Sequence, residues 1–409
     1  MTLDELVYDP GDPAILRNPH QVFARLREED PVHWSEPMSG WIVSTYDDIT
    51  EGLTDGRTFS AERLTNVRKH LPAPAMASAE EVLRYLSSWM VFRDAPDHTR
   101  LRRHMAAVLN LPVFESLHGT IESLSAELLD TLPADEPFDM LRRFSILLPG
   151  MVVMELMGVD RSRLLEVKGW SDDMMLFIGS ARGVPDKYER ARRGATEMAA
   201  LFRELIARRR ADPQGDMLSQ LIVSEVQGHR LGDDELIGCL MMVLNGGHET
   251  TANLINNSLT ALAGHPEVAD WLRARPEAMP TAVEEFLRYD SPILSVGRIV
   301  KEETELGGKQ LSVGERVFFM LLSANRDAEV FDDPFTLDVT RDPNPHMAFG
   351  KGPHFCLGTP LARIEGQIVL RQVLERFSRI ELAEPIENVP WINSLVTRGP
   401  SRLPLRLSR

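Results

Sequence analysis

Cys356 has the surroundings best suited to chemistry in this chain of 409 residues. It closes a glycine-rich segment, Phe349-Gly350-Lys351-Gly352-Pro353-His354-Phe355-Cys356-Leu357-Gly358. A helical pattern with Pro360 in its first turn follows directly. The free amides and the positive dipole end at a helix N-terminus stabilise a thiolate, and glycines let backbone amides approach the sulfur. With Phe349 as an apolar screen, the segment predicts a thiolate ligand of a soft metal centre.

Two plainer interpretations of this segment were weighed. A buried cysteine in a glycine-rich turn needs no metal at all. A zinc site fits poorly, because His354 and Cys356 are too close for an ordinary ligand pair and no Cys-x-x-Cys occurs. The second cysteine, Cys239, is far away in the sequence, so two cysteines do not make a disulfide framework.

A second unusual feature is the pair Gly246-Gly247 in the middle of the longest helical pattern. That pattern runs from about Asp233, a plausible N-cap, to about Ala263, and would span roughly 45 Å. Each glycine costs about 0.5–1 kcal/mol relative to alanine inside a helix. Such a violation of local preference predicts either a functional groove or close packing against another backbone.

The elements that must hold these residues are mostly helices. Helical periodicity dominates the first 290 residues, and strand-like pieces occur near Val32–Trp34, Trp41–Ser44 and Arg298–Phe319, with more after Phe377. Residues 326–347 show little periodicity and many turn formers, which predicts an ordered meander leading into the cysteine segment. We expect one domain over residues 1–409, with a helical core at about 95–290 and β-richer ends.

Composition excludes several classes of function. Hydrophobic residues make up 43% and charged residues 26% of the chain, which is typical of a globular protein. The formal net charge of −16 disfavours nucleic acid as a partner. There is no apolar run of membrane-spanning length, and the acidic N-terminus is unlike a secretory signal. We therefore expect a cytoplasmic protein without a membrane anchor.

The cysteine segment resembles the haem-ligand signature of the cytochrome P450 family, Phe-Gly-x-Gly-x-His-x-Cys-x-Gly, at all six specified positions. The resemblance implies the cytochrome P450 fold, mainly α with a smaller β region. It also implies a heme b cofactor (iron protoporphyrin IX) with Cys356 as the axial ligand of the iron. Phe349, Gly350 and Gly358 would then surround the cofactor.

Three further segments are similar to motifs of the same family. Glu285-Phe286-Leu287-Arg288 resembles its Glu-x-x-Arg pair, which is structural and takes a third partner from the meander, here Arg326 or Arg341. Gly246-Gly247-His248-Glu249-Thr250-Thr251 resembles the oxygen-activation motif on the long helix. Asp94-Ala95-Pro96-Asp97-His98-Thr99-Arg100-Leu101-Arg102 resembles the start of the helix that passes under the haem.

The oxygen-activation motif implies a catalytic pair. Gly246 would leave a groove for dioxygen, Thr250 would present its hydroxyl there, and Glu249 would link it to solvent as an acid. The plain alternative for Thr250 is a hydroxyl bonded back to the preceding helical turn. His248 occupies the variable position of the motif and would only line the helix exterior.

The resemblance also implies contacts with the haem propionates. His98 and Arg102 lie four residues apart on one helix face, so both would reach a propionate. Arg298 and His354 occupy the two other propionate-binding positions. The alternative for any one of these residues is a solvated basic face.

The reaction implied is insertion of one atom of dioxygen into a C–H or C=C bond of a lipophilic small molecule. Electrons would come from a separate ferredoxin or flavodoxin, because no residues remain for a flavin or iron–sulfur segment. Arg100, Arg103 and Lys351 would form its dock on the cysteine side of the haem. We expect a monomer.

Two rival functions were considered. A peroxide-driven peroxygenase or a non-oxygenating relative typically lacks the acid–alcohol pair, and a haem sensor would need an output module.

The sequence constrains the identity of the substrate less than it constrains the type of reaction. By family analogy the pocket is lined by residues 85–92, 174–178, 244–247 and 293–296, and by Leu395 and Val396, which are mainly apolar. A carboxylate substrate would need a cation nearby, such as Arg84 or Arg182.

Overall fold

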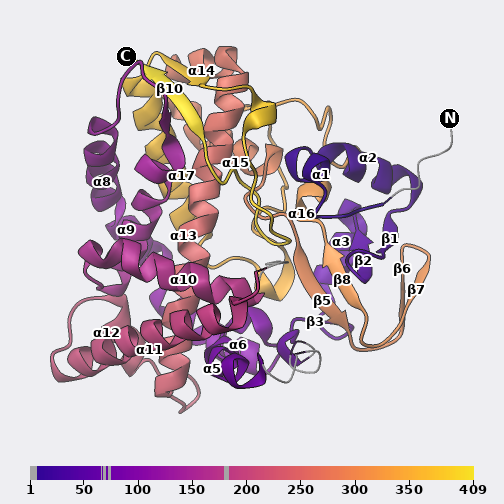
Figure 1. The fold of residues 1–409 in the computed structure, drawn as a ribbon, viewed down its shortest axis with the longest axis vertical. Coiled ribbons are helices and arrows are strands. Elements are labelled where there is room, and N and C mark those ends of the chain that lie inside the picture. Colours follow the sequence, from indigo (N-terminus) through magenta and orange to yellow (C-terminus); the bar gives the residue numbers. More distant parts are fainter. Residues whose placement is uncertain (1–6, 66, 68–70, 72–74, 179–183) are drawn as a thin grey trace.

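The computed structural model describes residues 7–65, 67, 71, 75–178 and 184–409. Figure 1 shows helices filling one side of the molecule and a sheet on the other. The described α-helices are α1 (Pro13–Arg17), α2 (His20–Glu29), α3 (Tyr46–Thr54), α5 (Met76–Leu86), α6 (Asp97–Val108), α7 (Leu111–Ser116), α8 (His118–Asp130), α9 (Leu147–Met157), α10 (Leu164–Ile178), α11 (Lys187–Ala211), α12 (Met217–Val223), α13 (Asp233–Gly264), α14 (Pro266–Arg273), α15 (Met279–Tyr289), α16 (Leu321–Ala324) and α17 (Thr359–Arg376).

Three sheets make up the β region. The largest has the strand order β1-β2-β8-β5-β3, in which β2 and β8 run parallel and the other pairs antiparallel. The second has the order β4-β10-β9, and the third is the β6-β7 hairpin. Their bounds are β1 (Val32–Ser35), β2 (Gly40–Val43), β3 (Phe59–Ser60), β4 (Phe138–Asp139), β5 (Val296–Val300), β6 (Thr304–Leu306), β7 (Lys309–Leu311), β8 (Arg316–Phe319), β9 (Arg379–Leu382) and β10 (Pro404–Ser408).

The long central helix is confirmed, with one correction at its start. α13 begins at Asp233 and continues to Gly264, so the glycine pair does not interrupt it. The N-cap is Gly232 rather than Asp233, because the Glu235 carboxylate accepts a hydrogen bond from the Gly232 amide at 3.0 Å. In Figure 1 α13 passes through the helical side of the molecule, and it packs against α9 and α17.

The strand expectations are confirmed in all four regions. Strands β3 and β4 were missed, because each has only two residues and leaves no measurable alternation. Residues 325–351 contain turns and bends but no helix or strand, as the meander prediction requires. None of the helices in the described part of the chain is long and apolar enough to cross a membrane.

Candidate cofactor site around Cys356

The loop before Cys356 is shaped by two glycines in the left-handed region, where other residues are strained. Gly350 and Gly352 both have φ of +71°. At Gly352 a side chain is also excluded by space, because a Cβ atom there would lie 2.5 Å from the backbone oxygen of Leu53 in α3. The loop closes when the Cys356 amide donates to the Phe349 carbonyl at 3.1 Å. The sequence of the loop is therefore fixed by the geometry that delivers the sulfur.

The Cys356 thiol is solvent-accessible although many protein atoms surround it. That crowding raises the pKa of the thiol, while the Gly358 amide, Thr359 and the Arg102 guanidinium act in the opposite direction. A Cβ atom at Gly358 would stand 3.7 Å from the sulfur, so the backbone approaches the sulfur closely here. Thr359 begins α17, and the sulfur thus lies just before a helix N-terminus, as predicted.

Phe349 lies in a cluster on the same loop. Its ring is 6.3 Å from the Phe355 ring, and the Arg363 guanidinium stands 5.3 Å from its centroid. Arg363 and His346 both bind the Glu284 carboxylate, at 2.6 and 3.0 Å. Burial raises the pKa of Glu284, but the hydrogen bonds from His346 and Arg363 outweigh it and lower that pKa to about 2. This network could not be predicted from the sequence, because a glutamate beside Glu285 is an ordinary residue of an exposed helix face.

The Glu285–Arg288 pair on α15 is fully buried and anchors the meander. Arg288 donates two hydrogen bonds of 2.7 Å to Glu285 and three more to the carbonyls of Asn325, Pro334 and Thr336. Arg341 is the third partner, with 3.3 Å between its Nε and Glu285. Arg326 instead donates to the carbonyl of Tyr289, which decides between the two candidates.

The structure brings together the four residues predicted to bind the cofactor edge. The rings of His98 and His354 are in contact, with centroids 4.1 Å apart and planes tilted by 42°. Arg102 donates to the Phe355 carbonyl at 2.7 Å, and Arg298 on β5 donates to the Gly297 carbonyl at 2.9 Å. Burial, with Arg298 next, lowers the pKa of His354 to about 3, so the ring is neutral in these surroundings.

These groups have an unusual shortage of negative partners. The Nε2 atom of His98 is buried without a hydrogen bond, and no carboxylate in the described ranges pairs with Arg102 or Arg298. Arg63, which sequence reasoning missed, stands over the Phe92 ring at 5.0 Å with its buried Nε unpaired. Burial and the neighbouring Arg298 lower the pKa of Arg63 to about 10. Desolvated cations of this kind are stabilised by an anion, and carboxylates such as the propionates of a haem would fit there.

The two glycines on α13 have different surroundings. A Cβ atom at Gly246 would meet nothing within 4 Å, whereas one at Gly247 would lie 2.8 Å from Cγ2 of Val153 in α9. Gly247 is thus explained by close packing, and Gly246 leaves open space. The Thr250 hydroxyl donates to the Gly246 carbonyl at 2.7 Å, which is the back-bonded geometry considered above.

Glu249 and His248, which precede Thr250 in the motif, each have a hydrogen-bonding partner elsewhere in the chain. Glu249 accepts a hydrogen bond of 2.8 Å from the Thr397 hydroxyl. The expectation for His248 was wrong, because the ring is buried and its Nε2 lies 2.7 Å from the Ile146 carbonyl, beside Gly150. Burial lowers the pKa of His248 to about 4. His248 therefore fastens α13 to the start of α9.

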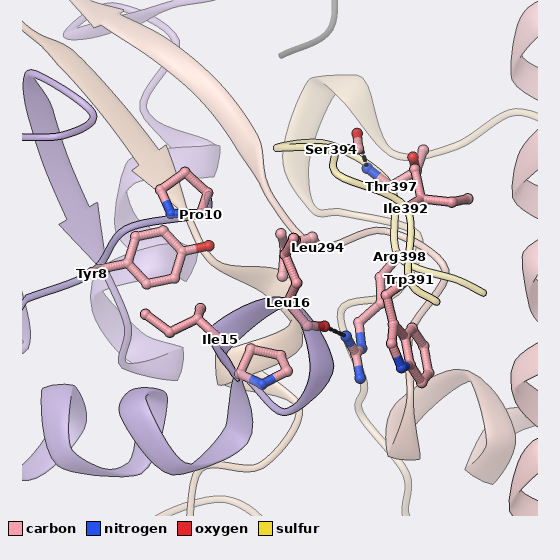
Figure 2. Close-up of a pocket in the computed structure, with 11 residues that line it drawn as sticks. Tyr8, Pro10, Ile15, Leu16, Leu294, Trp391, Ile392, Ser394, Thr397 and Arg398 are labelled. Atoms are coloured by element: carbon pink, nitrogen blue, oxygen red, sulfur yellow. Dashed lines mark hydrogen bonds between the residues drawn. The ribbon is translucent and has the colours of Figure 1, made fainter. Parts of the chain in front are cut away.

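Two hollows are found near these elements. One has a volume of about 480 Å³ and is lined by Glu62, Leu64, Thr65, Glu80, Leu83, Arg84, Ser87, Phe92 and Arg93. It includes part of the expected pocket wall at 85–92, but Arg84 is bound to Asp234 at 2.8 Å, and Arg182 lies outside the described residues. The other, between Tyr8 and Trp391 (Figure 2), has only about 20 Å³ of free space, enough for one water molecule.

A single exposed cysteine before a helix N-terminus, a cluster of His98, His354 and buried arginines, and a glycine with open space on the long helix α13 together fit a haem-thiolate protein. Among the described residues there is also no group of three or more His, Cys, Asp or Glu that could hold a metal ion. The cytochrome P450 family model matches residues 60–275 and 277–401, and the chain belongs to that family. It is accordingly a haem-thiolate monooxygenase, which uses dioxygen and a redox partner.

Three relatives illustrate the likeness. The polyketide biosynthesis cytochrome P450 PksS of Bacillus subtilis is 33% identical over 100% of both chains. Its solved structure matches with a TM-score of 0.88, covering 98% of this chain and 100% of that one. The 6-deoxyerythronolide B hydroxylase of Saccharopolyspora erythraea is 35% identical over 95% of this chain and 96% of its own. The solved complex of P450BioI with an acyl carrier protein carrying hexadec-9Z-enoic acid is 31% identical with a TM-score of 0.88, covering 97% of this chain and 99% of that one.

Proposed function

We propose that this monooxygenase hydroxylates or epoxidises a lipophilic product of secondary metabolism, of the polyketide or acyl-chain class, with electrons from a ferredoxin or flavodoxin. The observation that carries the proposal is the Cys356 loop, in which two glycines at positive φ and a hydrogen bond from the Cys356 amide to the Phe349 carbonyl place the cysteine just before α17. The substrate class is supported by two relatives named for polyketide chemistry.

The cofactor is proposed to be heme b, with Cys356 as its axial ligand and His98, Arg102, Arg298 and His354 around its propionates. When bound, the haem supplies the activation of dioxygen, and the thiolate donates electron density to that step. Gly350 and Gly358 would let the backbone come close to the sulfur, and Phe349 would cover one side of the site as an apolar screen. Gly246 leaves room on the opposite side.

Thr250 and Glu249 are proposed to move protons on the dioxygen side. The Thr250 hydroxyl donates to Gly246 and still has free lone pairs, so it can accept a proton or a hydrogen bond from a neighbouring group. Burial raises the pKa of Glu249, which keeps a proton on that carboxyl closer to neutral pH. A protonated acid beside an alcohol suits proton delivery.

The substrate wall is proposed to include Leu244 and Met174, which are buried, together with Leu294, Leu395 and Val396. These side chains offer apolar surface and orient a substrate by shape rather than by charge. Arg84 is already neutralised by Asp234, so it does not favour a carboxylate substrate.

The dock for the electron carrier is proposed on the Cys356 side, with a revised set of charges. Arg100 is paired with Glu235 and contributes little free charge. Lys351 binds the Thr50 hydroxyl at 3.1 Å and keeps its charge, and Arg103 is exposed. We therefore assign the steering of an acidic carrier to Arg103 and Lys351. The same proposal describes a cytoplasmic monomer.

The test is a difference spectrum of the reduced protein with carbon monoxide, followed by a screen of lipophilic compounds for a shift in iron spin state. We expect the thiolate signature in the wild type and its loss in Cys356→Ser. A normal signature in Cys356→Ser would reject the assigned ligand. Turnover with peroxide alone, and none with an electron donor and dioxygen, would reject the dioxygen-dependent route.

A further inference from the structure

Glu249 is joined to a distant part of the chain by a hydrogen bond that the motif does not require. The Thr397 hydroxyl donates to Oε1 of Glu249 at 2.8 Å, across 148 positions of sequence. Thr397 is buried, with 7% of its surface exposed. The partner of Glu249 is a neutral hydroxyl on a loop. Because it is not a cation, it positions the Glu249 carboxyl without requiring that carboxyl to be ionised.

The loop that carries Thr397 belongs to the proposed substrate wall. The amides of Val396 and Thr397 both donate to the Ser394 hydroxyl at 3.1 Å, and the second of these bonds is drawn in Figure 2. The Leu294 amide donates to the Val396 carbonyl at 2.8 Å, and the Ser295 hydroxyl donates to the Leu395 carbonyl. Hydrogen bonds therefore join the loop to residues 293–296, and Thr397 joins it to Glu249 on α13.

The charged groups that face Glu249 come from α10. Lys168 and Asp172 form an ion pair there and act on the carboxyl in opposite directions. The largest influence is burial, which raises the pKa of Glu249, and the Thr397 hydrogen bond lowers it. His248 is turned away toward the Ile146 carbonyl. Thr397 is thus the uncharged contact that opposes the effect of burial and makes Glu249 lose its proton more readily.

We propose that Thr397 is a positioning residue that ties the Glu249 carboxyl to the substrate-wall loop, so that the state of this loop sets the acidity of the proton donor. The inference rests on the proposed role of Glu249. A movement of the loop that breaks the contact removes a donor from the carboxylate, and the acid then takes up its proton from solvent at a higher pH. The Thr397 hydroxyl has one proton to donate, so Glu249 loses this hydrogen bond when the hydroxyl moves to another acceptor.

The test is the pH titration of the Glu249 carboxyl stretch in the infrared spectrum of the ferric holoenzyme, identified by difference against Glu249→Gln. One hydrogen bond of ordinary strength corresponds to a shift of about 0.5–1 pH unit. We expect Thr397→Val to titrate higher by this amount and Thr397→Ser to titrate as the wild type does. Thr397→Ala is the second variant should the valine distort the loop, with the same expected shift.

Thr260→Val is a matched control on α13, because its hydroxyl bonds back to the Asn256 carbonyl. It should leave the titration unchanged. An unchanged midpoint in both Thr397→Val and Thr397→Ala, with the wild-type circular dichroism, overturns the inference. An equal shift in Thr397→Ser does so too, because the serine keeps the hydroxyl.

The titration requires no turnover, so it separates this inference from the proposed function. If Glu249→Gln leaves oxygenation and its coupling to electron consumption unchanged, the proton-delivery role is wrong whatever Thr397 does. If Glu249→Gln uncouples the reaction while the Thr397 variants titrate normally, the role stands and the positioning contact is wrong.

Discussion

Replacing the two glycines of α13 by alanine, one at a time, should change stability in opposite directions. At Gly246 the new methyl group meets nothing within 4 Å, so only the helix preference remains, and it favours alanine by about 0.5–1 kcal/mol. At Gly247 the methyl group would lie 2.8 Å from Cγ2 of Val153. Val153 is fully buried and has a stiff χ1 angle, so it cannot turn away easily.

Overpacking a well-filled core costs about 1–3 kcal/mol, which exceeds the gain in helix preference. We therefore expect Gly247→Ala to lower the free energy of unfolding by roughly 0.5–2 kcal/mol, with Gly246→Ala raising it slightly. The measurement is urea unfolding followed by circular dichroism at equal haem loading, comparing midpoints only where the slopes agree. In turnover, Gly246→Ala should lose coupling, because its methyl group enters the proposed dioxygen groove.

A double-mutant cycle with Val153→Ala identifies the cause. Removing the valine methyl groups should relieve Gly247→Ala, giving a coupling energy of at least about 1 kcal/mol. Gly246→Ala combined with Val153→Ala should be additive within about 0.5 kcal/mol. The reasoning is refuted if Gly247→Ala is as stable as Gly246→Ala, or if its cycle shows no coupling.

Three further predictions concern a paired carboxylate, a buried carboxyl without partners and a buried guanidinium. Glu284→Gln should lower the free energy of unfolding at pH 7, because the hydrogen bonds from His346 and Arg363 outweigh burial and lower the Glu284 pKa to about 2. This stabilisation is present above pH 4.5 and is lost as the pH falls toward 2, so urea unfolding should show the difference between variant and wild type at pH 7 and its loss near pH 2. Glu365 is buried with both carboxyl oxygens unpaired, and burial raises its pKa to about 8. The free energy of unfolding should therefore decline as the pH rises from 4.5 through 8, and Glu365→Gln should flatten that decline. Arg63→Met should speed the transfer of haem to an acceptor protein about tenfold or more, as expected for the loss of one charge-assisted hydrogen bond. Arg84→Met is the control and should leave the transfer rate unchanged. Equal transfer rates in the two variants would show that Arg63 does not bind the cofactor.

The fold and the sulfur site were predictable because local rules and global structure agree there. The glycines before Cys356 are required by positive φ values and by the approach to Leu53, so their spacing appears directly in the sequence. The α13 pattern is long enough for helical periodicity to be unmistakable. The choice of Arg341 over Arg326 was not predictable, because it depends on how the irregular meander folds back on α15.

The residues that sequence reasoning missed share one physical property. Arg63, Glu284 and Thr397 take their meaning from partners far away in the chain, and no short motif surrounds them. His248 was misjudged for the same reason, since a histidine on a helix gives no sign of the carbonyl it will meet. Periodicity reports which face of an element is buried, but not which polar partner waits there.

Two groups of buried charged residues lie in the elements that lead to and surround the cysteine segment, and they have different partners. One group is a buried network of Glu285, Arg288 and Arg341, in which Arg288 donates hydrogen bonds from all three of its nitrogens. These bonds hold the meander against α15, so the network is structural. At the proposed cofactor edge, Arg63 and Arg298 are buried cations whose pKa burial lowers to about 10, and a bound anion would offset that desolvation. The buried network therefore holds the meander that precedes the cysteine segment, and we propose that the buried cations bind the carboxylates of the cofactor.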